Sequence, residues 1–180
     1  MISLNREKNF VDDYVVFDLE TTGFDPKISK IIEIGALKYR NNELVEELSI
    51  LINPGCRIPD IITAITGIDD ELVKDAVSIA DALPQFILFI EDLPLVAHNS
   101  RFDLSFIEEN ILELGLPMIQ NKNIDTVYLS RKYIKDVYNH KLETLKDHFG
   151  LTYSSHRSVE DCLTTNYVYQ YCKNKATVNS

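Results

Sequence analysis

The stretch from Tyr14 to Gly23 constrains the fold more than any other part of this sequence. It begins as an apolar run, which leads to two acidic residues, Asp18 and Glu20, and it closes with Thr-Thr-Gly. Side chains alternate between the two faces of a strand, so apolar neighbours such as Val16 and Phe17 indicate burial on both sides. This segment is therefore predicted to be an inner strand of a sheet that is covered on both faces.

The spacing of Asp18 and Glu20 predicts a metal site. Residues two apart on a strand project on the same side, which brings both carboxylates within reach of one ion. Two charges at the end of a buried strand are costly unless something neutralises them. The alternative is an acidic strand end that runs into a turn, and these two residues alone do not decide between the two interpretations.

Length and composition indicate one compact domain. The chain has 180 residues, 45% of them apolar, which suits a single core. It has no apolar stretch of membrane-spanning length, and residues 1–10 do not resemble a secretion signal. The three cysteines, Cys56, Cys162 and Cys172, show no CxxC spacing, so we expect reduced thiols. The expected location is cytoplasmic, with no membrane partner.

The charge balance disfavours a protein that binds nucleic acid over a broad basic surface. Eighteen basic and 28 acidic side chains give a net charge of -10, which disfavours a broad electrostatic grip on nucleic acid. A contact confined to a few nucleotides beside bound divalent ions remains compatible with this charge, because the ions reverse the local field.

Hydrophobic periodicity predicts an α/β fold. Residues 31–39 and 44–52 are expected to form a hairpin of two strands with a turn at Asn41 and Asn42. Shorter strands are expected at 95–97 and 123–125. Helices are expected within 61–90 and at 103–114, 127–133, 142–149 and 159–173. The result is a mixed five-stranded sheet flanked by helices, with residues 1–12 as an arm, 13–174 as the domain and 175–180 as a tail.

Two further segments place carboxylates at helix starts. Asp103 follows Ser100 by three residues, and Asp161 follows Ser158 in the same way, which is a helix-capping pattern. The helix dipole also keeps a first-turn carboxylate ionised, as a metal ligand requires. His156 precedes Asp161 by five residues and is a candidate base, because the pKa of histidine lies near neutrality.

Three motifs together resemble the DnaQ-like, or DEDDh, 3′-5′ exonucleases. They are Asp18-Leu-Glu20-Thr-Thr-Gly23, His98-Asn-Ser-Arg-Phe-Asp103 and His156-Arg-Ser-Val-Glu-Asp161. The resemblance runs from about Tyr14 to Tyr169 and is greatest to the proofreading epsilon subunit of bacterial DNA polymerase III and to the exonuclease domain of PolC-type polymerases. It implies a ribonuclease H-like fold.

The resemblance also implies a catalytic set. Asp18, Glu20, Asp103 and Asp161 would bind two divalent metal ions, Mg²⁺ or Mn²⁺, and His156 would deprotonate the attacking water. Oxygen ligands without a thiolate fit those ions better than Zn²⁺. The residues that the resemblance places at the substrate are Thr21, Thr22, Gly23, Thr66, Gly67, Ile68, His98, Asn99 and Phe102.

The function expected from the resemblance is release of nucleotides from DNA 3′ ends in proofreading or repair. The substrate would be single-stranded or frayed DNA, and a polymerase is a candidate partner, although the short segment after the last predicted helix provides no long tether. Two alternatives stay open at this point. One is an exoribonuclease that trims RNA ends or short oligoribonucleotides, and the other is a catalytically silent nucleic-acid-binding module.

Overall fold

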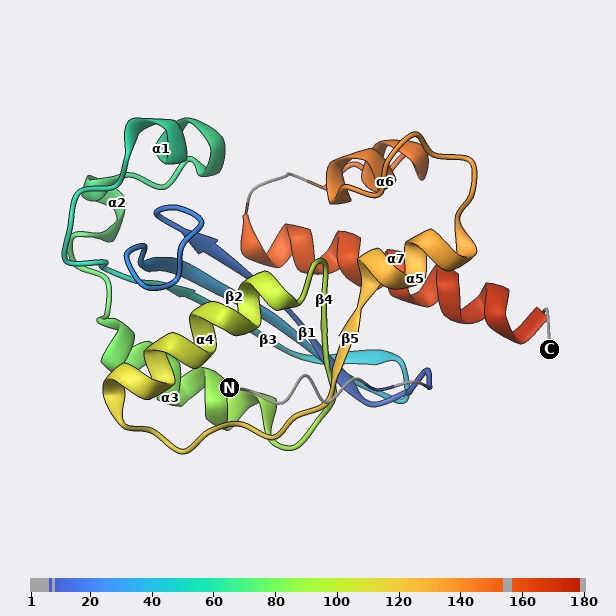
Figure 1. The fold of residues 1–180 in the computed structure, drawn as a ribbon, viewed down its shortest axis with the longest axis horizontal. Coiled ribbons are helices and arrows are strands. Elements are labelled where there is room, and N and C mark those ends of the chain that lie inside the picture. Colours follow the sequence, from blue (N-terminus) through green and yellow to red (C-terminus); the bar gives the residue numbers. More distant parts are fainter. Residues whose placement is uncertain (1–6, 8, 154–156, 179–180) are drawn as a thin grey trace.

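The fold is built around one five-stranded sheet with the order β3-β2-β1-β4-β5 (Figure 1). A computed structural model describes residues 7, 9–153 and 157–178. Within it, β1 pairs antiparallel with β2 and parallel with β4, and β4 pairs parallel with β5. The strands are β1 (Tyr14–Thr21), β2 (Ile31–Arg40), β3 (Glu43–Leu51), β4 (Leu95–Ala97) and β5 (Asn123–Asp125).

A two-residue turn sets the register of the β2–β3 hairpin. Asn41 and Asn42 both have positive φ, 51° and 64°, and Arg40 pairs with Glu43 across the turn. Asparagine tolerates this left-handed conformation better than most residues, which explains its use at both positions. The predicted hairpin and its Asn-Asn turn are therefore confirmed.

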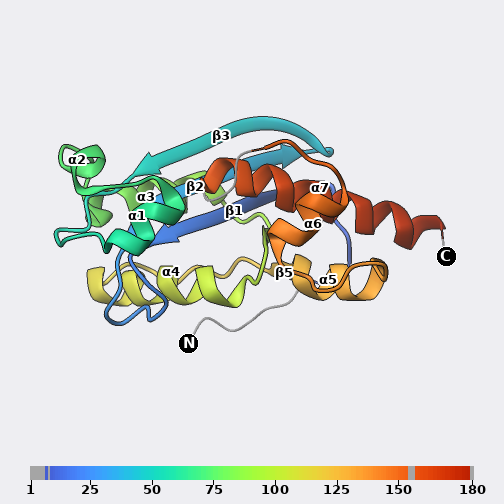
Figure 2. The same cartoon turned by 90° about the horizontal axis from the view of Figure 1, so that it is seen from above.

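The helices cover both faces of the sheet (Figure 1). Val15, Phe17 and Leu19 of β1 pack with α3 and α4, whereas Tyr14 and Val16 pack with α7. Figure 2 shows α1 and α2 at the end of the molecule opposite the C-terminus. The helices are α1 (Asp60–Thr66), α2 (Asp70–Val73), α3 (Ile79–Ile90), α4 (Arg101–Leu114), α5 (Thr126–Tyr133), α6 (Leu142–His148) and α7 (Ser158–Val178).

The predicted fold class, a ribonuclease H-like α/β fold with a mixed five-stranded sheet flanked by helices, is confirmed by this arrangement. The largest difference in a boundary is at the end of α7, which continues to Val178 instead of ending near Lys173. The division into arm, domain and tail stays a prediction. Within the described part of the chain, no helix combines the length and apolar character needed to cross a membrane.

Gly35 of β2 lets α7 approach the sheet closely. A Cβ atom at this position would lie 2.4 Å from Ser158 Oγ and 2.6 Å from the Ser158 carbonyl carbon. Both residues are buried, so neither chain segment has free space into which it can move. The first turn of α7 therefore lies against the backbone of β2.

We predict that Gly35→Ala destabilises the fold by about 1–3 kcal/mol, because the added methyl group overpacks this contact. Urea unfolding followed by circular dichroism measures the change. Ser49→Ala is the matched control, because Ser49 pairs with Gly35 across β2 and β3 but is exposed. It should change stability by less than about 0.5 kcal/mol. Equal stability of the two variants would contradict the close approach.

Candidate active site

The carboxyl end of β1 brings three acidic side chains together. Asp18 and Glu20 lie on the face of β1 that is covered by α7, and Asp161 lies in the first turn of that helix. Asp18, Glu20 and Asp161 each provide a carboxylate oxygen, and these oxygens lie within 4.8 Å of one another. The predicted proximity of Asp18 and Glu20 is therefore observed, and Asp161 joins them from a distant part of the sequence.

Asp103 reaches the same end of β1 from the first turn of α4. Its side chain is only 2% exposed, and its Oδ1 atom accepts a hydrogen bond of 3.2 Å from the backbone N–H of Leu19. Leu19 lies between Asp18 and Glu20 in β1, so this bond fixes Asp103 against the strand that carries them. We call Asp18, Glu20, Asp103 and Asp161 the acidic site.

The helix-capping interpretation of the serines is wrong. Ser100 has helical φ and ψ values and makes no capping bond, and its hydroxyl group donates to Asn123 Oδ1 instead. The hydroxyl group of Ser158 is buried without a hydrogen-bond partner. Capping by these serines therefore does not explain the positions of Asp103 and Asp161.

Burial and mutual repulsion perturb the acidic site. Loss of water, followed by repulsion from Asp103 and Asp161, raises the pKa of Asp18 well above its ordinary value. Burial raises the pKa of Glu20 to about 8, with repulsion from Asp161 as the next cause. Burial also raises the pKa of Asp103 to about 8, against the opposing effect of the Leu19 hydrogen bond.

These carboxylates fit a divalent metal ion. The oxygens of Asp18, Glu20 and Asp161 are close enough to share an ion, and without one these carboxylates and Asp103 repel one another in a poorly hydrated place. A bound cation would offset both costs at once. The donors are all oxygen atoms, which is the ligand set that Mg²⁺, Mn²⁺ and Ca²⁺ prefer.

The loop after β1 is tightly held beside the acidic site. The Thr21 hydroxyl donates to the Gly23 carbonyl at 2.7 Å, and the Thr22 hydroxyl accepts from the Lys30 backbone N–H at 2.9 Å. Gly23 lies close to Ser29, since a Cβ atom at position 23 would lie 2.7 Å from Ser29 Oγ. The backbone of Thr21, Thr22 and Gly23 is therefore fixed in place.

Two aromatic rings lie at this end of the molecule. Phe102 of α4 is half-buried, and its ring centroid lies 6.5 Å from that of Phe24. Phe24 follows Gly23 and is 87% exposed, which is unusual for a phenylalanine. The sequence analysis did not identify Phe24, although its position directly after the first motif was a usable signal.

Other predicted substrate residues have structural contacts. Thr66 and Gly67 close α1, with Gly67 at φ 71°, while Ile68 is fully buried with Ile32. The Thr66 hydroxyl accepts from the Ile68 N–H at 3.0 Å. The buried Ile68 side chain is turned away from any ligand in solvent, so only the backbone of this segment is available.

His98 is held on both sides of its ring. Nδ1 lies 2.8 Å from Thr126 Oγ1, and Nε2 lies 2.9 Å from the His140 carbonyl oxygen. Burial lowers the pKa of His98 to about 4, so the ring is neutral at pH 7. Asn99 follows with φ 67°, and its N–H donates to Asp125 Oδ1. These contacts fix the loop that precedes Asp103.

The predicted base, His156, lies outside the described residues. The chain is described again from Arg157, and here the structure identifies two residues that the sequence analysis did not. Arg157 pairs with Glu33 of β2, Nη2 to Oε1 at 2.9 Å. Glu33 is 1% exposed, and its position as the one charged residue of the apolar run 31–37 was a usable signal.

The sequence matches the exonuclease family RNase_T over residues 15–169. DNA polymerase III PolC-type from Caldanaerobacter subterraneus subsp. tengcongensis is 42% identical over 94% of this chain and 12% of the relative. The protein of that name from Clostridium perfringens is 39% identical over 92% of this chain and 12% of the relative. The chain thus spans about an eighth of the length of these relatives.

Solved exonucleases share the fold. A complex of exonuclease X with 5′ overhanging duplex DNA has a TM-score of 0.72 and 24% identity, covering 91% of this chain and 93% of that one. E. coli exonuclease I with a dT13 oligonucleotide has a TM-score of 0.81 and 15% identity, covering 94% and 42%. The chain therefore belongs to the exonuclease family.

We predict that the metal-free protein loses stability as the pH rises from about 4 to 8. Glu20 and Asp103, with pKa values of about 8 in the fold, retain protons that the unfolded chain releases near pH 4. The folded state therefore binds more protons in this window, and raising the pH favours unfolding. Thermal unfolding in EDTA between pH 4.5 and 8.5 measures the slope.

Asp103→Asn should flatten this slope, whereas the exposed Asp92→Asn should leave it unchanged. Adding Mn²⁺ should raise the melting temperature most at the alkaline end, because the ion binds the ionised carboxylates. A melting temperature that rises with pH over the same window in EDTA would contradict the assignment.

Proposed function

We propose that this exonuclease releases nucleotides from the 3′ ends of DNA with two divalent metal ions, Mg²⁺ or Mn²⁺. The observation that carries the proposal is the convergence of Asp18, Glu20 and Asp161 oxygens within 4.8 Å of one another, with Asp103 beside them. The PolC-type relatives are DNA polymerases, and two structural neighbours are complexes with duplex DNA and with a dT13 oligonucleotide, which supports DNA as the substrate.

The four acids would hold the metal ions. Asp18 and Glu20 approach from β1, and Asp161 approaches from α7, so a pair of ions would be held from two sides. A metal pair about 3.5–4 Å apart activates a water and stabilises the leaving oxygen of a phosphodiester. The buried Asp103, fixed by Leu19, would keep its carboxylate oriented without large reorganisation.

His156 is proposed as the base that takes a proton from the attacking water. The support is its sequence position five residues before Asp161, together with an ordinary pKa near neutrality. The rigid Thr21–Gly23 backbone is proposed to contact the sugar of the terminal nucleotide, and Phe102 its base. An aromatic face accepts any base, which suits removal of nucleotides without sequence preference.

The PolC-type relatives support a role in proofreading, with the chain acting beside a DNA polymerase in the cytoplasm. Stacking and metal ligation by themselves do not distinguish the sugar, so RNA is the alternative substrate that an experiment has to compare directly.

We predict faster release of nucleotides from single-stranded and mispaired duplex DNA than from matched duplex DNA or RNA, in the presence of Mg²⁺ or Mn²⁺. Asp18→Asn and Asp161→Asn should each lower release at least about 10²-fold, because each removes a charge that holds the ions. Gel analysis of labelled strands measures the rates, with Asp25→Asn, an exposed residue of the neighbouring loop, as the control. Full activity in excess EDTA would refute the metal mechanism, and faster digestion of RNA would refute the DNA assignment.

We predict that His156→Ala lowers turnover by roughly 10²–10⁴-fold while Mn²⁺ binding to the protein stays within a few-fold of wild type. The reason is that the imidazole is proposed to move a proton and not to bind the ions. Single-turnover kinetics across pH 5.5–9 give the rate, and calorimetry gives the metal affinity. His148→Ala is the matched control, since His148 belongs to α6. A wild-type rate at pH 7 would remove His156 from the mechanism.

A further inference from the structure

Glu33 is an additional carboxylate beside the acidic site. It lies on β2 directly opposite Glu20 of β1, and directly opposed residues of an antiparallel pair point to the same face. Its side chain is 1% exposed. Repulsion from Glu33 contributes to the raised pKa of both Asp18 and Glu20. A further buried negative charge at this place is unfavourable unless its contacts compensate for it.

Those contacts all go to the start of α7. Glu33 Oε1 accepts from Arg157 Nη2 at 2.9 Å and from Nε at 3.3 Å, and Oε2 lies 3.4 Å from the same Nε. Glu33 Oε2 also accepts from the backbone N–H of Ser158 at 3.0 Å. One carboxylate therefore binds both a side chain and a main-chain donor at the helix N-terminus, where N–H groups lack partners within the helix.

The backbone connects this contact directly to Asp161. The Arg157 carbonyl oxygen accepts from the Asp161 N–H at 3.0 Å, so Asp161 is bonded to the residue that Glu33 holds. Gly35, two residues after Glu33, lets the Ser158 backbone lie against β2. The Glu33–Arg157 pair and the Gly35 contact together determine where the first turn of α7 begins.

The pair also preserves the local charge balance. Arg157 is 43% exposed on its side chain and offsets the charge of Glu33, and it lowers the pKa of Glu20 by its proximity. Loss of Glu33 therefore makes the acidic site less negative, whereas loss of Arg157 makes it more negative. Either loss disturbs the start of α7 in the same way. This difference provides a test.

We propose that Glu33 and Arg157 are positioning residues that hold Asp161 in its metal-binding place. This inference rests on the proposed two-metal function and deepens it. Neither residue has to touch the substrate or the ions, since both act through the backbone of the first turn of α7. Groups that orient metal ligands in this way typically change metal affinity by about 10–100-fold when removed.

The test is Mn²⁺ binding to the protein without nucleic acid, measured by isothermal titration calorimetry. Glu33→Ala and Arg157→Ala should each weaken binding by about 10–100-fold. The double variant should bind about as weakly as the single variants, because both substitutions break one contact. Glu33→Gln should fall between wild type and Glu33→Ala, because its amide oxygen still accepts from Ser158.

A purely electrostatic role predicts a different pattern. Removing the Glu33 charge would weaken cation binding, whereas removing the Arg157 charge would strengthen it. The inference would be overturned if the two single variants changed Mn²⁺ affinity in opposite directions, if their effects added in the double variant, or if the affinities stayed unchanged. Glu47→Gln on β3 is the control for charge, because Glu47 is exposed and should leave Mn²⁺ affinity unchanged.

Turnover provides a second measurement. If the defect is in ligand placement, high Mn²⁺ concentrations should restore nucleotide release by the folded variants, and failure to restore it would overturn the inference. Circular dichroism establishes folding, and if Glu33→Ala does not fold, the partly exposed Arg157→Ala carries the test. The proposed function itself would be overturned if the wild-type protein neither bound Mn²⁺ nor released nucleotides. Failure of the proposed function is thus distinguished from failure of the inference about Glu33 and Arg157, which concerns only the variants.

Discussion

Repulsion among poorly hydrated carboxylates at the carboxyl end of β1 is the constraint on which the rest of the structure depends. Asp18 and Glu20 are held there by a strand that is buried on both faces, so neither can turn toward solvent without moving the core. Asp103 and Asp161 approach from helices on either side of the same strand end. The fold thus keeps together charges that would separate in a flexible chain, and a bound cation would make the arrangement favourable.

The four acids are held by contacts of three kinds. The β1 pair depends on strand pairing with β2, and Asp103 depends on the Leu19 N–H. The start of α7 depends on Glu33 and on the space that Gly35 leaves. Because these contacts are separate, a change in the contact of Asp103 or of Asp161 displaces that carboxylate and leaves the others in place. The acidic site can therefore be weakened gradually instead of all at once.

Local patterns explain why much of the fold could be predicted. Consecutive apolar residues up to Phe17 define β1, and the two consecutive asparagines define the hairpin turn. The motif acids were predicted for the same reason, since their spacing along one strand or helix start is visible in the sequence.

Two of the differences from the prediction are local, and two come from contacts between distant residues. Ser100 resembles a helix cap in sequence, but its backbone is already helical. The last helix continues to Val178 because residues 174–178 contain no glycine or proline, and Lys175 favours the helix C-terminus. Glu33 is the one charged residue of the run 31–37, but the sequence does not show its partner Arg157, which is 124 residues away. Burial of His98 between Thr126 and His140 is likewise a tertiary feature.

The net charge of -10 says little about the field that a DNA strand would meet. The hairpin turn joins Arg40 to Glu43, which are opposite each other in the register of β2 and β3. The start of β1 lies at the same end of the sheet, because Tyr14 is opposite Tyr39 in the register of β1 and β2. Exposed acids on the edge strand β3 discourage pairing with other chains, which is a structural use of charge.

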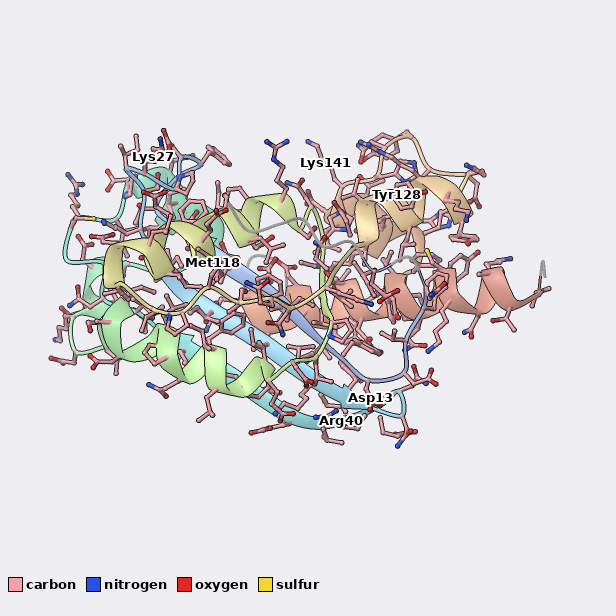
Figure 3. All side chains as sticks on the ribbon, turned by 60° about the horizontal axis from the view of Figure 1, so that its bottom comes forward. Asp13, Lys27, Arg40, Met118, Tyr128 and Lys141 are labelled. Carbon is pink, nitrogen blue, oxygen red and sulfur yellow. The ribbon has the colours of Figure 1, made fainter. Side chains whose placement is uncertain are left out.

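The acidic site lies at the other end of β1. Figure 3 shows Lys27 and Lys141 on the side of the molecule opposite Asp13 and Arg40. The acids of the hairpin end are therefore separated from the strand end where the ions would bind. Bound ions would be the largest charges at that end, and the acids that hold them would no longer repel a phosphate. An acidic protein can in this way bind the end of a nucleic-acid strand beside the ions, while the rest of the protein surface repels the phosphates.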